Sequence, residues 1–232
     1  MIENYDTKNP TTIIPDQGSE EFLISIINND SDTIQSLSTT ELNNYLIKSS
    51  NLQVMNVHSS KSKIIFTYKP YAFRDVTWDI KEIVELEENK HYLHKYIQIK
   101  SSNPDVRIDY IDFDSFIFKD SDLKNSWSTT FTEDTIKNLG QPIYINSLFF
   151  GCQFPLTESK IESNQKLSRI RYYTGKKFSD LSLNEDKYYE TWKTVIGVAH
   201  NNDISTVRKD FFSYISDISV SSQLRRQYND LN

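Results

Sequence analysis

Apolar and polar residues alternate along most of this 232-residue chain, which is typical of β-strands with one buried face. Phe22, Ile24 and Ile26 form the first such segment. Seven later segments repeat the pattern and are expected to be strands: residues 64–68, 76–86, 93–99, 106–110, 143–150, 167–173 and 189–198. In the second of these, Glu82 is the one polar residue on an otherwise apolar face. The polar residues 87–90 join two long alternating segments and predict a β-hairpin.

Two short segments favour helix instead. Ser38 and Glu41 have the spacing of a capping box, which predicts a short helix that ends before Ser49. Residues 132–139 are expected to form a helical turn that Gly140 stops.

The C-terminal part of the chain has helical periodicity. Apolar residues recur there at intervals of three or four positions: Ile204, Val207, Phe211, Ile215 and Ile218. Asp203 or Ser205 can supply the N-cap. We therefore expect an amphipathic helix whose apolar stripe packs against the rest of the molecule.

A run of strands closed by one helix indicates a mainly β fold, an antiparallel sandwich with a C-terminal amphipathic helix. An all-β sandwich can hold this length as one unit, so residues 20–219 are expected to form one domain that includes the helix. Residues 1–19 are polar and rich in turn formers, which predicts a loose or edge segment. Residues 220–232 are expected to lead out of the domain.

Composition narrows the range of partners. A formal charge of -6 disfavours binding to nucleic acid and to anionic membranes. The single cysteine, Cys152, cannot form an internal disulfide. The N-terminus lacks the features of a signal peptide and no apolar run approaches a membrane span, so the chain as given reads as cytoplasmic. Heavy use of Asn, Ile, Lys and Ser is typical of AT-rich bacterial genomes.

The common catalytic motifs are missing from the sequence, and we expect no cofactor and no metal. His91 and His94 are three positions apart, and on a strand that spacing points the rings to opposite faces. Five acidic residues are candidates for calcium binding or acid–base chemistry: Asp109, Asp112, Asp114, Asp120 and Asp122. No glycine-containing calcium loop accompanies them, so surface solubility and turn formation explain them more simply.

Three tryptophans are candidates for carbohydrate contact, because the C–H faces of sugar rings stack on flat aromatic side chains. Trp78 and Trp192 lie in alternating segments, and this pattern favours the core. Trp127 lies in a polar segment where no burial pattern explains it, so it is the better candidate. Plugging the end of a sandwich is the alternative role for Trp127.

Several short motifs occur in an order that resembles large bacterial α-galactosidase-like glycoside hydrolases. The motifs are LGQP at 139–142, LFFGCQFP at 148–155, RIRYY at 169–173, TVIGVA at 194–199 and RKDFFSY at 208–214. Residues 93–99 and 106–111 look like paired strands of a galactose-mutarotase-like supersandwich. The resemblance covers roughly residue 62 to the end of the chain.

In that family the supersandwich leads through a helix into a catalytic TIM-type barrel that carries the carboxylates. Gln227, Tyr228 and Asn229 look like the beginning of the first barrel strand. The resemblance therefore implies a non-catalytic N-terminal domain, inactive alone, whose partner is a barrel absent from this chain. Gln153 stands where the family has an acidic residue, and it is a candidate carbohydrate contact together with Trp127 and Trp78.

Two alternatives from other classes stay open. A free-standing aldose epimerase would need a histidine and a carboxylate on one concave face, and the spacing of His58, His91, His94 and His200 does not unite them. A carbohydrate-binding module would need exposed aromatic side chains on a common surface. A domain separated from its barrel is also expected to self-associate through exposed apolar surface.

Overall fold

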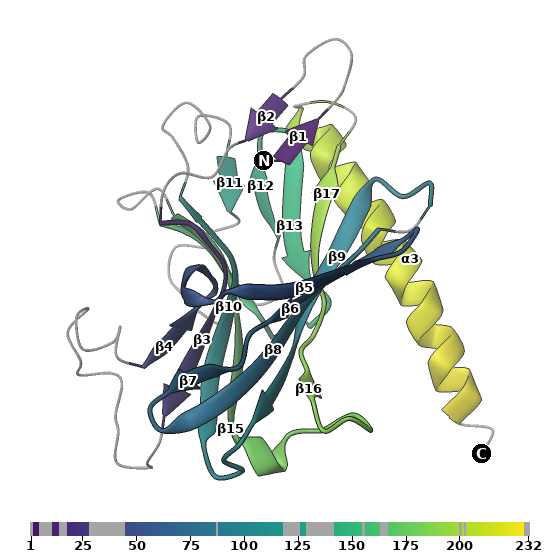
Figure 1. The fold of residues 1–232 in the computed structure, drawn as a ribbon. Coiled ribbons are helices and arrows are strands. Elements are labelled where there is room, and N and C mark those ends of the chain that lie inside the picture. The colour runs from purple at the N-terminus through teal and green to yellow at the C-terminus, as the bar shows by residue number, and fades with distance from the viewer. Residues whose placement is uncertain are drawn as a thin grey trace.

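The computed structural model describes residues 2–4, 11–13, 18–27, 45–86, 88–117, 126–128, 142–154, 156–162, 167–199, 201 and 203–229. For residues 2–4, 11–13, 126–128, 162, 204 and 218–229 it describes the backbone alone. The described chain is mainly β, with antiparallel sheets and one long C-terminal helix (Figure 1). The predicted fold class, a mainly β sandwich closed by a helix, is confirmed at that level.

One sheet has five antiparallel strands. In spatial order these are β14 (Glu158–Glu162), β15 (Leu167–Lys177), β10 (Arg107–Ile117), β3 (Glu20–Ile27) and β4 (Leu46–Lys48). The long strands β10, β15 and β3 form its centre. A separate two-stranded ribbon pairs β1 (Ile2–Asn4) with β2 (Thr11–Ile13).

The other sheet has ten strands. Its main path runs through β11 (Ser126–Ser128), β12 (Ile143–Ile145), β13 (Leu148–Cys152), β17 (Thr194–Val198), β9 (Tyr92–Ser101), β8 (Val76–Glu85), β6 (Lys63–Tyr68) and β5 (Val54–Ser59). Off this path, β16 (Tyr189–Glu190) pairs with β9, and β7 (Tyr71–Phe73) pairs with β8. Two 3-10 turns cover Ser49–Asn51 and Phe178–Asp180.

The two sheets pack face to face around one apolar core (Figure 1). Phe22 and Ile24 of β3 enter it from one side, and Trp78 and Ile80 of β8 enter it from the other. Alternation therefore predicted the buried faces of these strands correctly, and Trp78 is a core residue. Glu82 continues the buried face of β8, and the Tyr68 hydroxyl donates a hydrogen bond of 2.7 Å to its carboxylate.

Helix α3 (Ile204–Asn229) covers the outer face of the ten-stranded sheet. Within β13, Phe149 points toward the helix, whereas Leu148 and Phe150 belong to the sandwich core. Asp203 caps the helix as predicted, because the Thr206 amide donates a 3.0 Å hydrogen bond to its carboxylate. Hydrogen bonds from Ser205 and Thr206 lower the pKa of Asp203. Among the described helices, none is long and apolar enough to cross a membrane.

One glycine makes the contact between α3 and the sheet possible. Gly197 of β17 lies directly opposite Phe149 of β13, and a Cβ at Gly197 would come within 1.8 Å of the Phe149 ring. The aromatic ring thus covers a bare stretch of backbone. Phe149 can then reach the rings of Phe211 and Tyr214 on the helix.

The β8–β9 hairpin is confirmed, and three other expectations are corrected. Residues 143–150 form parts of two strands, since the chain turns at Asn146 with a φ of 51°. Leu46, expected near the end of a short helix, lies in β4, while Ser38, Glu41 and residues 132–139 fall outside the described residues. Residues 227–229 continue α3 and do not begin a strand.

Candidate functional site

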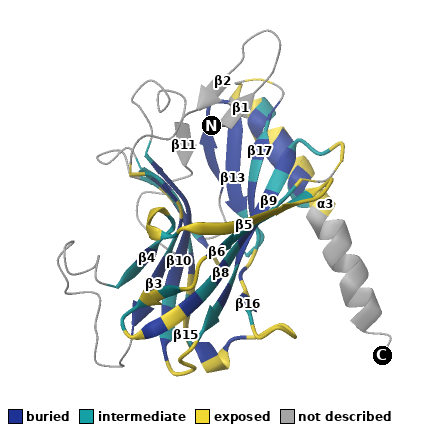
Figure 2. Ribbon diagram, viewed as in Figure 1, coloured by how far each residue is buried: buried dark blue, intermediate teal, exposed yellow. Residues whose placement is uncertain are grey.

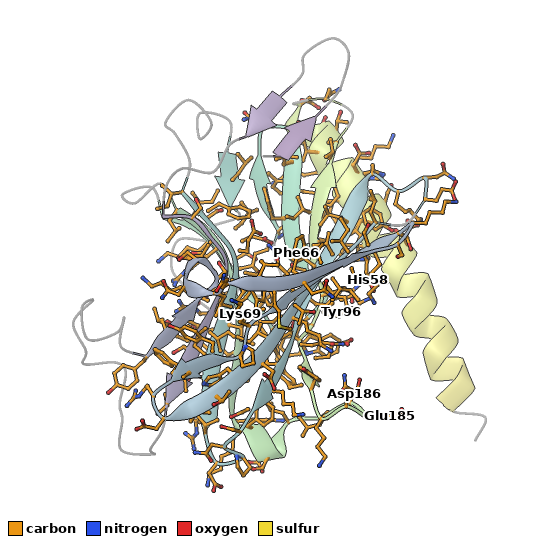
Figure 3. All side chains as sticks on the ribbon, viewed as in Figure 1. His58, Phe66, Lys69, Tyr96, Glu185 and Asp186 are labelled. Carbon is orange, nitrogen blue, oxygen red and sulfur yellow. The ribbon has the colours of Figure 1, made fainter. Side chains whose placement is uncertain are left out.

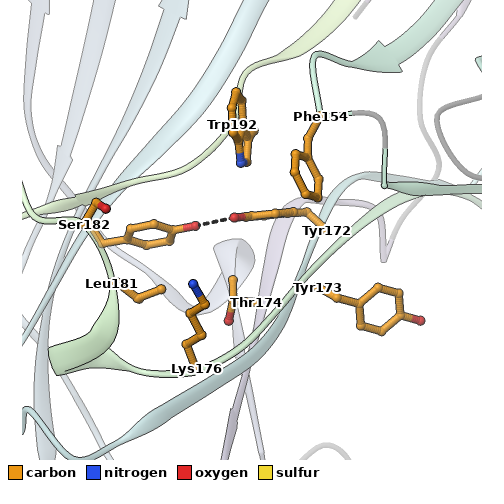
Figure 4. Close-up of a pocket in the computed structure, with 9 residues that line it drawn as sticks. Phe154, Tyr172, Tyr173, Thr174, Lys176, Leu181, Ser182 and Trp192 are labelled. Carbon is orange, nitrogen blue, oxygen red and sulfur yellow. Dashed lines mark hydrogen bonds between the residues drawn. The ribbon is translucent and has the colours of Figure 1, made fainter.

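An aromatic pocket with a volume of about 380 Å³ lies between the two sheets at one end of the sandwich. Its residues come from β15, the turn after it, the segment after β13 and the segment around β16. The described residues that line it are Phe154, Tyr172, Tyr173, Thr174, Lys176, Leu181, Ser182, Tyr189 and Trp192 (Figure 4).

Two stacked aromatic rings form one wall of the pocket. The Trp192 indole lies parallel to the Phe154 ring, with 5.2 Å between centroids and 23° between planes. The backbone on both sides of Trp192 is fixed, because Thr191 donates to the carbonyl of Ile97 and Gln153 donates to that of Lys193. Trp192 nevertheless keeps 46% of its surface exposed. A flat, pre-positioned ring is therefore available to a ligand.

Two tyrosine hydroxyls form the polar part of the pocket. The Tyr189 hydroxyl lies 2.8 Å from that of Tyr172 and donates to it (Figure 4). Burial raises the pKa of Tyr189, so its phenol stays protonated. Because Tyr172 accepts this bond, its own proton is free to turn toward a bound group. Phe154 packs edge-on against Tyr172 at 5.2 Å and fixes the position of that ring.

The pocket lining holds no carboxylate, imidazole or thiol among its described residues. Glycoside hydrolysis ordinarily uses a pair of carboxylates on either side of the scissile bond, and the described lining does not supply them. Cys152 lies near the pocket, but burial raises its thiol pKa to about 12 and leaves it protonated. The flat rings and the hydroxyl groups of the lining can bind a ligand by stacking and by hydrogen bonds.

No protein-family model matches this chain, and no curated protein matches it in sequence. The resemblance to glycoside hydrolases therefore stays a prediction. What the site can bind must be inferred from the chemistry of its own residues.

The pocket gathers none of the three residues proposed from the sequence as carbohydrate contacts. Trp78 has no exposed surface, so it cannot stack on a ligand, and this assignment is corrected. The Gln153 amide lies 3.4 Å from the His94 ring and does not line the pocket. The Trp127 side chain is outside the described residues, although its backbone pairs with Tyr144 in the sheet.

The prediction from the sequence for Trp192 is wrong. It was expected on the inner face of a strand, but it lies between β16 and β17, half exposed. The sequence carries no signal against this expectation, because the alternation of β17 continues without a break through Thr194 to Trp192.

The histidines lie elsewhere. His58 is exposed on β5, and the His91 ring packs against Tyr92 and Phe149. His94 is buried beside Tyr214 of α3, and His200 is outside the described residues. In the described ranges, no group of three or more His, Cys, Asp and Glu residues could hold a metal ion.

A buried ionic cluster ties the two sheets together, away from the pocket. The Lys95 ammonium of β9 contacts the carboxylates of Glu21 in β3, at 2.7 Å, and Asp114 in β10. Glu82 and its partner Tyr68 complete the cluster. Burial raises the pKa of Asp114 to about 6 and also raises that of Glu82, whereas Lys95 lowers the pKa of the more exposed Glu21. Lys95 is 2% exposed, so we assign this cluster to stability.

Two of the five acidic residues were thus wrongly expected at the surface. Asp114 is buried against Lys95, at a bulge in β10 where its φ is 51°. Asp112 is also buried, and the Arg171 guanidinium donates two hydrogen bonds to it, of 2.6 and 2.8 Å. Desolvation raises the pKa of Asp109, which is only partly buried. Asp120 and Asp122 lie outside the described residues.

Proposed function

We propose that this chain is a non-catalytic carbohydrate-binding domain that belongs to a glycoside hydrolase. The observation that carries the proposal is the exposed Trp192 ring, stacked on Phe154 at the wall of a concave pocket with tyrosine hydroxyls inside it. Sugars present apolar C–H faces to aromatic rings and hydroxyl groups at their edges. A pocket with one flat wall and a few polar groups matches both features.

The arrangement suggests how a sugar ring would lie. One face would stack on the Trp192 indole, and an edge oxygen would accept the proton of Tyr172. Ser182 can donate or accept at the opposite side of the pocket. Since the described lining carries no pair of carboxylates, binding of a saccharide without cleavage is the function that the site supports best.

Replacing Trp192 by alanine is expected to weaken saccharide binding by at least about tenfold, because a central aromatic ring contributes most in such a site. Isothermal titration calorimetry with neutral and acidic oligosaccharides measures the dissociation constants. Trp192→Phe keeps a flat ring and should retain part of the affinity. Phe212→Ala removes an exposed ring on α3 and serves as the control, since it should bind as the wild type does. Equal affinity of Trp192→Ala and the wild type would contradict the proposal.

A second observation favours a role in supporting a partner domain. The edge strand β5 is exposed along its whole length, as Figure 2 shows, and it carries Val54, Met55 and Val57. β5 and β6 form a hairpin. Tyr68 and Ile64 lie on the same face of β6, and Tyr68 is buried whereas Ile64, near the tip of the hairpin, is exposed. Figure 3 marks this hairpin by Phe66 and His58. We propose that a catalytic barrel packs against this surface. In a galactose-mutarotase-like supersandwich, α3 would connect the sandwich to that barrel.

The hairpin proposal predicts self-association of the chain alone. Sedimentation at rising concentration should show oligomers, because the apolar hairpin lacks its partner. Val57→Lys should shift the distribution toward the monomer by placing a charge in the middle of the patch. A wild-type chain that stays monomeric at the highest concentration would count against this second role, while the sugar-binding role would be unaffected.

A further inference from the structure

The charge of the pocket indicates which class of saccharide it takes. Lys176 of β15 is the one charged side chain among the described residues of the lining. Within the part of the chain that the structure describes, no carboxylate lies close enough to Lys176 to form an ion pair. Its neighbour Lys177 differs, since that ammonium lies 3.9 Å from Asp105. Among the described residues, therefore, no ion pair neutralises the charge of the Lys176 ammonium in the pocket.

Figure 4 shows how Lys176 is directed. Its ammonium points from β15 toward the hydrogen bond that joins the two tyrosine hydroxyls, and the Trp192 ring lies beyond that bond. Lys177 is the next residue in the strand, so its side chain leaves on the other face. Lys176 is an exposed residue at the edge of the pocket, so a ligand stacked on Trp192 would have the Tyr172 hydroxyl and the Lys176 ammonium on the same side.

Hydrogen-bond donors outnumber free acceptors in this space. Lys176 brings an ammonium with three donors and no acceptor. Tyr172 has its proton free, because its oxygen already accepts from Tyr189. The Thr174 hydroxyl is committed to the backbone carbonyl of Ile108. Neutral sugars bring hydroxyl protons that need acceptors, whereas a carboxylate or sulfate brings acceptors alone.

We infer that the pocket selects an acidic saccharide, with the sugar ring on Trp192 and a carboxylate or sulfate group at Lys176. This inference rests on the carbohydrate-binding function proposed above. The chain has a formal charge of -6, so general attraction does not bring anions to it, and the preference must come from the local cation.

The test compares three oligosaccharides that differ at one carbon. The first carries a neutral hydroxymethyl group at C6 of its terminal sugar, the second a C6 carboxylate and the third a 6-O-sulfate. At low salt the wild type should bind at least one of the anionic forms about tenfold more tightly than the neutral form, as a charge-assisted hydrogen bond would give. Lys176→Gln should abolish this preference, and added salt should reduce it. Lys177→Gln removes the same charge from the other face of β15 and should leave the preference intact.

The outcomes separate this inference from the function on which it rests. If all three forms bind equally well and Trp192→Ala weakens all of them, the acidic preference is wrong and the carbohydrate site stands. If none of a broad set of neutral and acidic saccharides binds the wild type, the proposed function itself fails. If only the carboxylate or only the sulfate form gains affinity through Lys176, the inference holds and the anion is identified. A preference that persists in Lys176→Gln overturns the assignment of Lys176.

Discussion

Replacing Lys95 by methionine is expected to lower the free energy of unfolding by about 3–5 kcal/mol, the cost of removing one partner from a buried ion pair. Lys95 is the cation between Asp114 and Glu21, and Glu82 also lies within its electrostatic influence. Methionine fills a similar volume but leaves the carboxylates without a counter-charge between the two sheets. Urea denaturation followed by tryptophan fluorescence measures the loss.

The pH dependence gives this prediction a distinctive signature. Burial raises the pKa of Asp114 to about 6, above the value of about 3.9 that it has in an unfolded chain. The folded state therefore holds this proton more tightly, and the resulting stability is full below pH about 4 and lost as the pH rises through about 6. Without Lys95 the carboxylates should stay protonated to higher pH, so Lys95→Met should be less destabilised at pH 5 than at pH 8.

Glu82→Gln is the matched control for Lys95→Met. It removes one of the three negative charges but keeps an oxygen that can accept the Tyr68 hydrogen bond, so its effect should be small. If Lys95→Met unfolds at the same urea concentration as the wild type, or if the two variants behave alike, the ionic cluster does not stabilise the sandwich as described.

Replacing Tyr214 by alanine is expected to cost about 3–5 kcal/mol of stability, as large cavities in aromatic cores do. Tyr214 is fully buried where α3 meets the sheet. Its ring centroid lies 4.8 Å from that of Tyr92, 5.9 Å from Phe211 and 6.2 Å from Phe149. Without this ring, the helix loses its central contact with β9 and β13.

The exposed neighbour Phe212 supplies the control for Tyr214. Phe212→Ala changes an aromatic ring on the same helix, yet its ring is 63% exposed and its loss should cost less than about 0.5 kcal/mol. Thermal unfolding monitored by far-ultraviolet circular dichroism compares the two variants. Equal melting temperatures for Tyr214→Ala and Phe212→Ala would show that α3 does not depend on this packing.

The strands could be predicted where burial alternates without interruption. Phe22, Ile24 and Ile26 face one core, and Trp78 faces it from the opposite sheet. These positions could be predicted because residues on one face of a strand recur at every second position in the sequence. The start of the helix at Asp203 could also be predicted, since capping depends on residues that are close together in the chain. Tyr214 was overlooked on the helix, although it lies three positions after Phe211, because tyrosine does not by itself indicate a buried face.

The ionic and aromatic groups could not be predicted from local patterns, because their partners are distant in sequence. Asp112 and Asp114 look like surface residues until Arg171 and Lys95 are seen against them. The pocket likewise brings together Phe154 and Trp192, which are distant in sequence but adjoin the paired strands β13 and β17. Alternation misplaced Trp192 in the core because it cannot show that the strand pairing is interrupted between Glu190 and Thr194.

The most direct measurement follows the three indole N–H resonances of Trp78, Trp127 and Trp192 by nuclear magnetic resonance during titration with an acidic oligosaccharide. Each resonance can be assigned by a single tryptophan-to-phenylalanine substitution. The Trp192 indole should shift progressively with added saccharide, while that of the fully buried Trp78 should stay in place. A saccharide that binds without moving the Trp192 resonance would contradict the location of the site in the aromatic pocket.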